Sequence, residues 1–228
     1  MKIDITIDFD GTVTLGDVTQ LVLERFADPK WLEVEAEWVA GRIGSRECLA
    51  RQAALLSASP GEIDALLDAV EIDPVFPRFV QEAHALGAAT KIVSDGFDRF
   101  IEPILARIDA KISLQSNRLI LTGSRSWRAE FPHVNRDCSS ESGVCKCASV
   151  AAGKFRLLIG DGRSDFCVAQ EADLVFAKGA LAEFCREQNI PYRPIATFRE
   201  ARVYLLELSK RLARGASSDS SLEQVQGA

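Results

Sequence analysis

The sequence lacks the features that mark membrane proteins and nucleic-acid-binding proteins. No stretch approaches the ~20 consecutive apolar residues that a membrane-spanning helix needs, and the N-terminus enters a strand-like pattern without a signal sequence. The formal net charge of −6 and the pI near 5.1 provide no basic field that would attract nucleic acid or an anionic membrane. We therefore expect a cytoplasmic protein that binds small solutes. The sequence does not indicate its oligomeric state.

Histidine is scarce, and the cysteines do not have the spacing of a metal site. The two histidines, His84 and His133, are isolated, and we expect them to be structural or exposed. Cys138, Cys145 and Cys147 invite a zinc hypothesis, but a C-x-C pair with one distant thiol lacks the usual paired C-x₂₋₄-C spacing. In a reducing compartment we favour free thiols for all six cysteines.

The composition is that of an ordinary soluble domain. Of the 228 residues, 47% are hydrophobic and 26% are charged. Single domains usually have ~100–200 residues, so this length allows one large core with a small appended domain. We find no internal repeat, and the only low-complexity tract is the Ser-, Gly- and Gln-rich segment at 215–228.

Strand and helix patterns alternate along the chain. Residues 3–8 alternate between isoleucine and polar side chains, which predicts a strand that ends at Asp8. From residue 17 to about 70 the pattern is helical, and residues 59–62 have the form of a capping box. The other predicted elements are helices at about 79–87, 97–107, 146–153, 164–171 and 197–214, strands at 88–93, 155–159 and 174–176, and a β-ribbon over 111–131 with Asn117-Arg118 as candidate turn.

This order predicts an α/β fold. Strands separated by helices favour a Rossmann-like, doubly wound parallel sheet with helices on both faces and right-handed crossovers. The helical segment after the first strand predicts a small all-helical cap, with Trp31 and Trp38 on one face of a helix in its core. We expect residues 1–14 and 75–213 to form the core, 15–74 the cap and 214–228 a flexible tail.

Polar signatures follow three of the predicted strands. Ligands of open α/β sheets bind outside the carboxyl ends of the strands, so these signatures should converge on one crevice. Each signature is a weak indication by itself, but three signatures in this order, each after an apolar run, form a specific pattern. They are Asp8-Phe9-Asp10-Gly11-Thr12, Ser94-Asp95-Gly96 and Gly160-Asp161-Gly162-Arg163-Ser164-Asp165.

The acidic residues of these signatures predict a metal site. Asp8 and Asp10 are two residues apart and therefore point the same way in an extended chain. With Asp161 and Asp165 they place four carboxylates in one cleft, and their mutual repulsion would be costly without a cation. Ligands that are all oxygen, without histidine or thiolate, favour Mg²⁺.

The same crevice is suited to a phosphate group. Ser94 supplies a hydroxyl at a predicted helix start, and we assign phosphate binding to Ser94, its neighbour Asp95 and Lys146. Lys154 competes with Lys146, which we favour because it opens a predicted helix. Phosphoryl transfer needs an in-line nucleophile and a proton for the leaving group. Asp8 can be the nucleophile and Asp10 the acid.

With these motifs in order, the sequence resembles the haloacid dehalogenase superfamily of phosphatases. The resemblance extends from Ile3 to about Phe176. It implies that Asp8 forms a phosphoenzyme, and that Asp10 protonates the leaving oxygen and later activates water. It also implies that Asp8, the Asp10 carbonyl and Asp161 hold Mg²⁺, supported by Asp165.

The helical insert resembles the type-1 cap of the phosphoserine-phosphatase branch. Serine phosphatases usually carry Ser and Glu where this chain has Gly11 and Asp17, which counts against serine phosphate. The motifs and the Cys145-Lys146 pair are more similar to the subfamily of methionine-salvage phosphatases that act on 2-hydroxy-3-keto-5-methylthiopentenyl-1-phosphate. Asp17 could contact the leaving group or form a helix N-cap.

Other functions could use the same aspartate chemistry. A phosphoserine phosphatase or a phosphotransferase would differ in the ester or in the acceptor of the phosphate. A phospho-accepting signalling module would stop at the phosphorylated aspartate without turnover. The predicted cap argues against such a module, because a receiver needs no lid over its aspartate.

Overall fold

The structure of the protein is a computed structural model, which describes residues 3–108, 110–135, 138, 141–147 and 154–214. The predicted tail at 215–228 and most of the predicted helix at 146–153 lie outside the described residues. None of the helices within these ranges is long and apolar enough to cross a membrane.

A seven-stranded sheet organises the molecule, in the order β4-β3-β2-β1-β5-β6-β7. The central strand β1 pairs in parallel with β2 and β5, so that Ile5 lies opposite both Thr90 and Leu157. Among the seven strands of this sheet, β3 and β4 pair antiparallel and the other neighbours pair in parallel. The strands are β1 (Ile3–Ile7), β2 (Ala89–Phe97), β3 (Ser113–Leu121), β4 (Trp127–Glu130), β5 (Phe155–Gly160), β6 (Leu174–Ala177) and β7 (Tyr192–Pro194).

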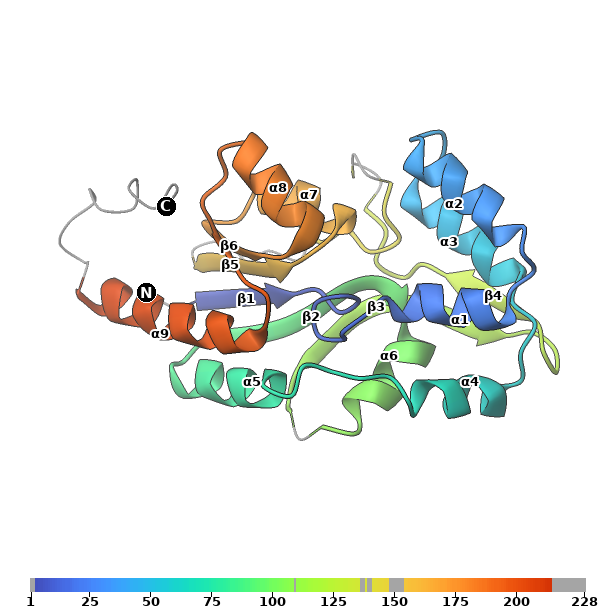
Figure 1. Cartoon of the computed structure of the whole chain (residues 1–228), viewed down its shortest axis with the longest axis horizontal. Coiled ribbons are helices and arrows are strands. Elements are labelled where there is room, and N and C mark those ends of the chain that lie inside the picture. The colour runs from blue at the N-terminus through green and yellow to red at the C-terminus, as the bar shows by residue number, and fades with distance from the viewer. Residues whose placement is uncertain (1–2, 109, 136–137, 139–140, 148–153, 215–228) are drawn as a thin grey trace.

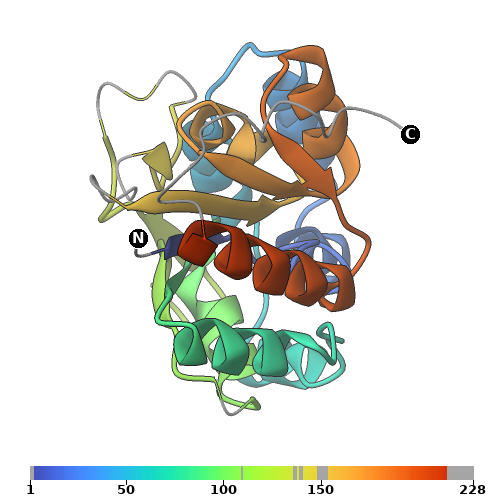
Figure 2. The same ribbon diagram turned by 90° about the vertical axis from the view of Figure 1, so that its left-hand side faces the viewer.

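Helices cover both faces of this sheet, as the predicted doubly wound α/β fold requires (Figure 1). One face carries α5 (Phe76–Ala85), α6 (Asp98–Leu105) and α9 (Phe198–Arg214), and α5 and α9 run side by side in Figure 2. The other face carries the short helix η2 (Arg163–Asp165), α7 (Phe166–Ala169) and α8 (Gly179–Glu187). Apolar side chains of β5 alternate between the two layers, with Ile159 in one core and Leu158 in the other.

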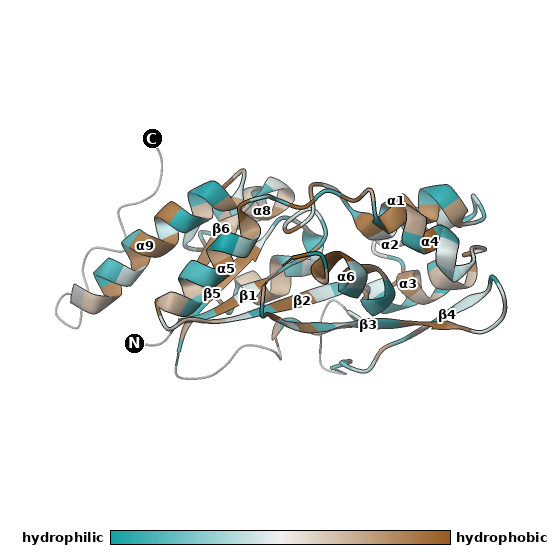
Figure 3. Cartoon of the chain, turned by 90° about the horizontal axis from the view of Figure 1, so that it is seen from below, coloured by the Kyte–Doolittle hydropathy of each residue, from teal (hydrophilic) through white to brown (hydrophobic). Residues whose placement is uncertain are grey.

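The helical insert lies at one end of the sheet (Figures 1 and 3). It contains α1 (Val18–Phe26), α2 (Trp31–Val39), α3 (Ser45–Ala54) and α4 (Pro60–Leu67). The predicted capping box is present: Glu62 N–H donates to Ser59 Oγ, and the Ser59 N–H donates to Glu62 Oε2 at 2.8 Å. The two ends of the insert meet in a β-bridge between Thr14 and Ile72.

Helix α4 is fastened to the core through two arginines. Arg99 of α6 donates from Nη2 to Asp64 Oδ1 at 2.6 Å and to the Pro60 carbonyl at 3.1 Å. Arg107 donates to the carbonyls of Asp68 and Val70 at 2.8 and 2.7 Å. This half of the insert is therefore tied to α6 by several independent hydrogen bonds.

The predicted β-ribbon is present, but its predicted turn at Asn117-Arg118 is wrong. Strand β3 runs straight through both residues, and the turn lies at 122–126, where the Thr122 N–H donates to the Ser126 carbonyl at 2.8 Å. Asn117 is fully buried and bonds to Asp95, so a tertiary contact overrides its turn propensity. The ribbon reaches the insert, because Trp127 Nε1 donates to the Ala58 carbonyl at 2.8 Å.

Two further differences from the predicted elements affect the site. Ser94 does not lie at a helix start: β2 continues through it to Phe97, with a bulge in its pairing with β3, and α6 begins at Asp98. The Gly96 N–H turns back to Ser94 Oγ at 3.0 Å, which satisfies it without a helix. Helix α8 and the three-residue strand β7 were not predicted from the sequence.

Asp73 joins three parts of the chain where the insert returns to the core. Its side chain is buried and accepts the N–H groups of Val75 and Phe198, both at 2.8 Å. Its own N–H donates to the Val13 carbonyl at 2.9 Å. Through its side chain and its backbone N–H together, Asp73 thus connects the start of α9 with the loop that follows β1.

We predict that Asp73→Ala lowers the free energy of unfolding by at least about 2 kcal/mol, because two N–H donors lose their acceptor. Asp73→Asn keeps one carbonyl oxygen and should cost less. Urea unfolding followed by circular dichroism measures both. Asp68→Ala, at an exposed aspartate that follows α4, is the matched control; an equal loss there would contradict the role of Asp73.

Candidate active site

The candidate site forms where the carboxyl ends of β1 and β5 meet. Asp8 follows β1 directly, is 5% exposed, and donates its N–H to the Ile159 carbonyl at 2.8 Å. Asp161 follows β5, the parallel neighbour of β1. Adjacent parallel strands therefore bring the first and third sequence signatures together, as predicted.

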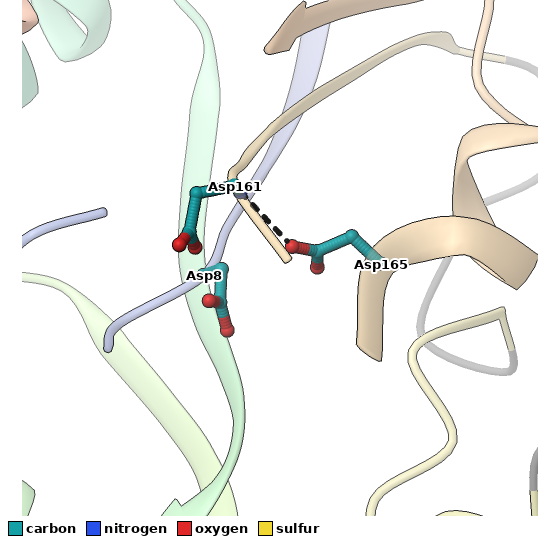
Figure 4. A group of neighbouring side chains, drawn as sticks. All are labelled: Asp8, Asp161 and Asp165. Atoms are coloured by element: carbon teal, nitrogen blue, oxygen red, sulfur yellow. Dashed lines mark hydrogen bonds between the residues drawn. The ribbon is translucent and has the colours of Figure 1, made fainter. Parts of the chain in front are cut away.

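Three carboxylates converge at this point (Figure 4). Each of Asp8, Asp161 and Asp165 offers one oxygen, and these oxygens all lie within 4.8 Å of one another. Asp165 comes from η2 and points toward the other two, while its Oδ2 accepts the Asp161 N–H at 3.3 Å. Within the described part of the chain, no other group of three or more His, Cys, Asp or Glu side chains meets so closely.

Lys146 supplies the buried positive charge of the site. Its Nζ donates to Asp8 Oδ1 at 2.6 Å, to Asp165 Oδ1 at 2.5 Å and to Ser164 Oγ at 3.1 Å, and the side chain is 1% exposed. Lys154 instead lies 3.7 Å from Asp4, a residue of β1 distant from Asp8. The structure therefore brings Lys146, and not Lys154, to the carboxylates.

The charges of the cluster are unbalanced. The pKa of Asp8 is raised well above its ordinary value. Burial is the largest cause, and the charges of Asp165 and Asp161 add to it, whereas Lys146 lowers the pKa. The pKa of Asp161 is also raised, by burial and then by Asp165. Burial alone would lower the pKa of Lys146, but Asp165 and Asp8 outweigh it and keep the lysine charged. One ammonium thus faces three carboxylates, and a second cation would relieve the excess negative charge.

The residues present fit a magnesium ion. The donor set is entirely oxygen, which suits a hard divalent cation that keeps several waters. Asp161 is held in place by the Thr12 hydroxyl, which donates to its Oδ1 at 3.0 Å. Gly11 leaves room on the other side: its φ is +69°, and a Cβ there would lie 2.4 Å from Asp161 Oδ2. Asp8 and Asp161 are the residues that would hold the ion, with Asp165 behind them.

Asp10 occupies a separate position from this triad. Its Oδ1 accepts the Val18 N–H at 2.8 Å, and a Cβ on Gly96 would lie 2.8 Å from its Oδ2 and 3.1 Å from Ser94 Oγ. Asp10 thus sits beside the second signature. Burial, and then the charge of Asp17, raise the pKa of Asp10 to about 8. The carboxyl is therefore mostly protonated near neutral pH, which is the form that a general acid needs.

Asp17 and Asp95 make contacts that the sequence left open. Asp17 is the N-cap of α1, since its side chain accepts the Gln20 N–H at 2.7 Å. This contact corresponds to the capping alternative. Asp95 has both carboxylate oxygens engaged by protein donors, among them the Val144 N–H at 3.0 Å. Its part in phosphate binding stays a prediction.

Sequence reasoning missed Lys178. This residue follows β6 directly, and its Nζ donates to the carbonyls of Thr12 and Gly11 at 3.1 and 3.4 Å. It therefore braces the loop between Asp8 and the insert. The signal was available, because Lys178 is the polar residue at the carboxyl end of another parallel strand.

The cysteines near Lys146 show no ligand-like convergence among the described residues. Cys138 Sγ donates to Ser142 Oγ at 3.8 Å, and Cys145 Sγ accepts from Asn135 at 3.6 Å. The thiol of Cys147 is hydrogen-bonded with Cys167, which raises its pKa. Among the described residues, none of these sulfurs forms a disulfide bond.

The class of protein follows from comparison with known families. The sequence profile of the haloacid dehalogenase-like hydrolases matches residues 5–170, which include all the signatures described above. The chain belongs to this family. The prediction of a phosphatase is confirmed at the level of the enzyme class.

Individual relatives and solved structures are similar to this chain over most of its length. The chain is 31% identical over 206 residues to the 2-hydroxy-3-keto-5-methylthiopentenyl-1-phosphate phosphatase of Brevibacillus brevis, covering 87% of this chain and 93% of the relative. It is 29% identical over 212 residues to the enzyme of the same name from Exiguobacterium, covering 90% and 98%. A solved structure of a phospho-aspartyl intermediate analogue of phosphoserine phosphatase superposes with a TM-score of 0.65 at 17% identity, covering 89% and 98%, and shares the fold.

We predict that Lys146→Met lowers the free energy of unfolding by about 3–5 kcal/mol in buffer without divalent cations, because Asp8 and Asp165 lose their buried partner. Chemical denaturation measures this loss. Lys154→Met is the matched control. Lys154 is partly exposed and its Nζ lies 3.7 Å from Asp4, so its loss should change stability little. Equal losses in the two variants would show that Lys146 does not balance the site.

Proposed function

We propose that the protein is a Mg²⁺-dependent phosphomonoester hydrolase that acts through an aspartyl-phosphate on Asp8. The observation that carries this proposal is the buried Lys146 ammonium shared by Asp8 and Asp165, with the Asp161 carboxylate beside them. A nucleophilic carboxylate, a fixed cation and a divalent-metal site are the components that phosphoryl transfer needs.

Asp8 is the nucleophile in this proposal. One of its carboxylate oxygens attacks the phosphorus, and the bond between phosphorus and the ester oxygen breaks. Lys146 orients the carboxylate through Oδ1 and offsets negative charge on the transferring group. Bound Mg²⁺ would supply further charge neutralisation for the phosphoryl oxygens. Ser94, which is buried next to Asp10, is proposed to bind a phosphate oxygen.

Asp10 moves the proton. In the first step its protonated carboxyl gives a proton to the leaving ester oxygen, so that an alcohol departs. In the second step the Asp10 carboxylate accepts a proton from the water that attacks the phosphorus of the aspartyl-phosphate, which frees Asp8 and releases inorganic phosphate. General acid–base help of this kind is typically worth ~10²–10⁴ in rate. The contact with the Val18 N–H fixes the carboxyl for both steps.

The names of the similar enzymes support a particular substrate. Enzymes named for 2-hydroxy-3-keto-5-methylthiopentenyl-1-phosphate align with this chain over nearly its whole length, and we propose this enol phosphate as the physiological ester. The likeness to phosphoserine phosphatases is one of fold at 17% identity and gives less support to serine phosphate.

We predict sustained release of phosphate from p-nitrophenyl phosphate by the wild-type protein only when Mg²⁺ is present, and none by Asp8→Asn. Phosphate release is measured by a colorimetric assay, and the phosphoenzyme by mass spectrometry after rapid acid quench. Asp4→Asn is the matched control: Asp4 is buried on the same strand, paired with Lys91 at 2.9 Å, and should leave turnover unchanged.

Three outcomes separate the alternatives. Turnover by Asp8→Asn would mean that another group is the nucleophile. A single stoichiometric burst without further release would identify a phospho-accepting module. Transfer of the phosphate to an added alcohol, in preference to water, would identify a phosphotransferase.

We predict that kcat/KM for the methionine-salvage enol phosphate exceeds that for phosphoserine and phosphocholine by at least about 100-fold, a difference of about 2.7 kcal/mol in transition-state stabilisation. Steady-state kinetics on a panel of phosphorylated metabolites measures it, with p-nitrophenyl phosphate as the reference for intact chemistry. A higher value for phosphoserine would overturn the substrate assignment and leave the hydrolase proposal standing.

A further inference from the structure

Asp95 connects three segments that are far apart in the sequence. Its Oδ2 accepts the hydroxyl of Ser45, the first residue of α3 in the insert. Its Oδ1 accepts the Val144 N–H at 3.0 Å and the Asn117 side-chain amide of β3 at 3.3 Å. One carboxylate beside the phosphate site therefore binds the insert, the β-ribbon and the loop that leads to Lys146.

Asn117 adds further contacts to this junction. Its side chain is fully buried, and its Nδ2 also donates to the Asp95 carbonyl at 2.6 Å. A Cβ on Gly143 would lie 2.5 Å from Asn117 Oδ1, so the loop backbone packs directly against the amide. That Oδ1 is buried without a hydrogen-bond partner in the described chain.

The loop held in this way carries the catalytic cation. Val144, whose N–H bonds to Asp95, is two residues from Lys146, whose Nζ reaches Asp8 and Asp165. Lys146 is 1% exposed and its Nζ is hydrogen-bonded to Asp8 and Asp165, so a shift of the Val144 backbone would be transmitted to the ammonium. A misplacement of about 1 Å in such a site can cost about 100-fold in rate.

The insert contacts the same loop at a second point. The Arg46 N–H donates to the Glu141 carbonyl at 3.0 Å, and a Cβ on Gly44 would lie 2.5 Å from that of Glu141. The start of α3 is thus in contact with the loop at Glu141 directly and at Val144 through Asp95. The same hydrogen bonds therefore hold α3 in position and hold the loop that carries Lys146.

We propose that Asp95 is a positioning residue that makes the phosphate site depend on the seating of the insert, with Ser45 as its partner on the insert. The inference rests on the proposed hydrolase function. A substrate whose leaving group keeps α3 seated would find Lys146 in place, whereas loss of the Ser45 contact would loosen Lys146 even toward an anion that never touches the insert.

The test uses inorganic phosphate, which has no leaving group. For Ser45→Ala we expect the inhibition constant of phosphate against p-nitrophenyl phosphate to rise about tenfold and kcat to fall about tenfold, with recovery in Ser45→Thr, which keeps the hydroxyl. Ser59→Ala is the matched control, because it removes a serine helix cap elsewhere in the insert and should change neither value. An unchanged inhibition constant in Ser45→Ala would overturn the proposal.

A double-mutant cycle separates action through Asp95 from direct contact with substrate. If Ser45 acts through Asp95, then Ser45→Ala adds no further loss to Asp95→Ala, whereas additive losses would mean that Ser45 acts on its own. Melting curves identify any variant that fails to fold.

Hydrogen exchange of the Val144 amide, measured by NMR, needs no turnover. It should quicken about tenfold in Ser45→Ala and not in Ser59→Ala. If the wild-type protein hydrolyses no ester, the proposed function fails while this exchange result still tests the coupling. If hydrolysis is normal and exchange is equal in the two variants, the coupling alone fails.

Discussion

The shared ammonium of Lys146 is the interaction on which the rest of the site depends. Asp8 and Asp165 are buried, and they can both stay ionised this close together only with a cation between them, which Lys146 supplies from a loop outside the sheet. In the proposed function, Asp161 would help to hold a metal ion. The fold provides the approach, because β1 and β5 are parallel neighbours whose carboxyl ends meet at one edge. The loop that carries the lysine must be held independently, and the contacts of Asp95 do this.

Much of this arrangement could be predicted from residue patterns. The strand before Asp8 and the strand before Asp161 are short apolar runs that end at an acidic signature, and parallel topology makes their ends converge. The capping box at Ser59 is local, so it needed no knowledge of the fold. These features are encoded within a few residues of where they act, which is why the sequence was sufficient for them.

The features that could not be predicted depend on contacts between distant segments. Asn117 is a good turn residue by type, yet it is buried in β3 because Asp95 and Gly143 surround it. Ser94 lies in a continuing strand, although its sequence is that of a helix start. Lys178 follows a predicted strand, so its place at the sheet edge was available from the sequence, but its hydrogen bond to the Thr12 carbonyl, 166 positions away, was not. In each case the partner, and not the residue itself, decides the structure.

The attachment of the insert is divided between its two halves. Helix α4 is bound to α6 through Arg99 and Arg107, while the α2–α3 half meets the site through Ser45 and through Arg163, which donates to the Val39 carbonyl at 3.1 Å. The two halves of the insert therefore contact the rest of the protein through different surfaces. A substitution that weakens the contacts of α2 and α3 would leave the contacts of α4 in place, so the insert could shift over the site while one of its halves stays attached.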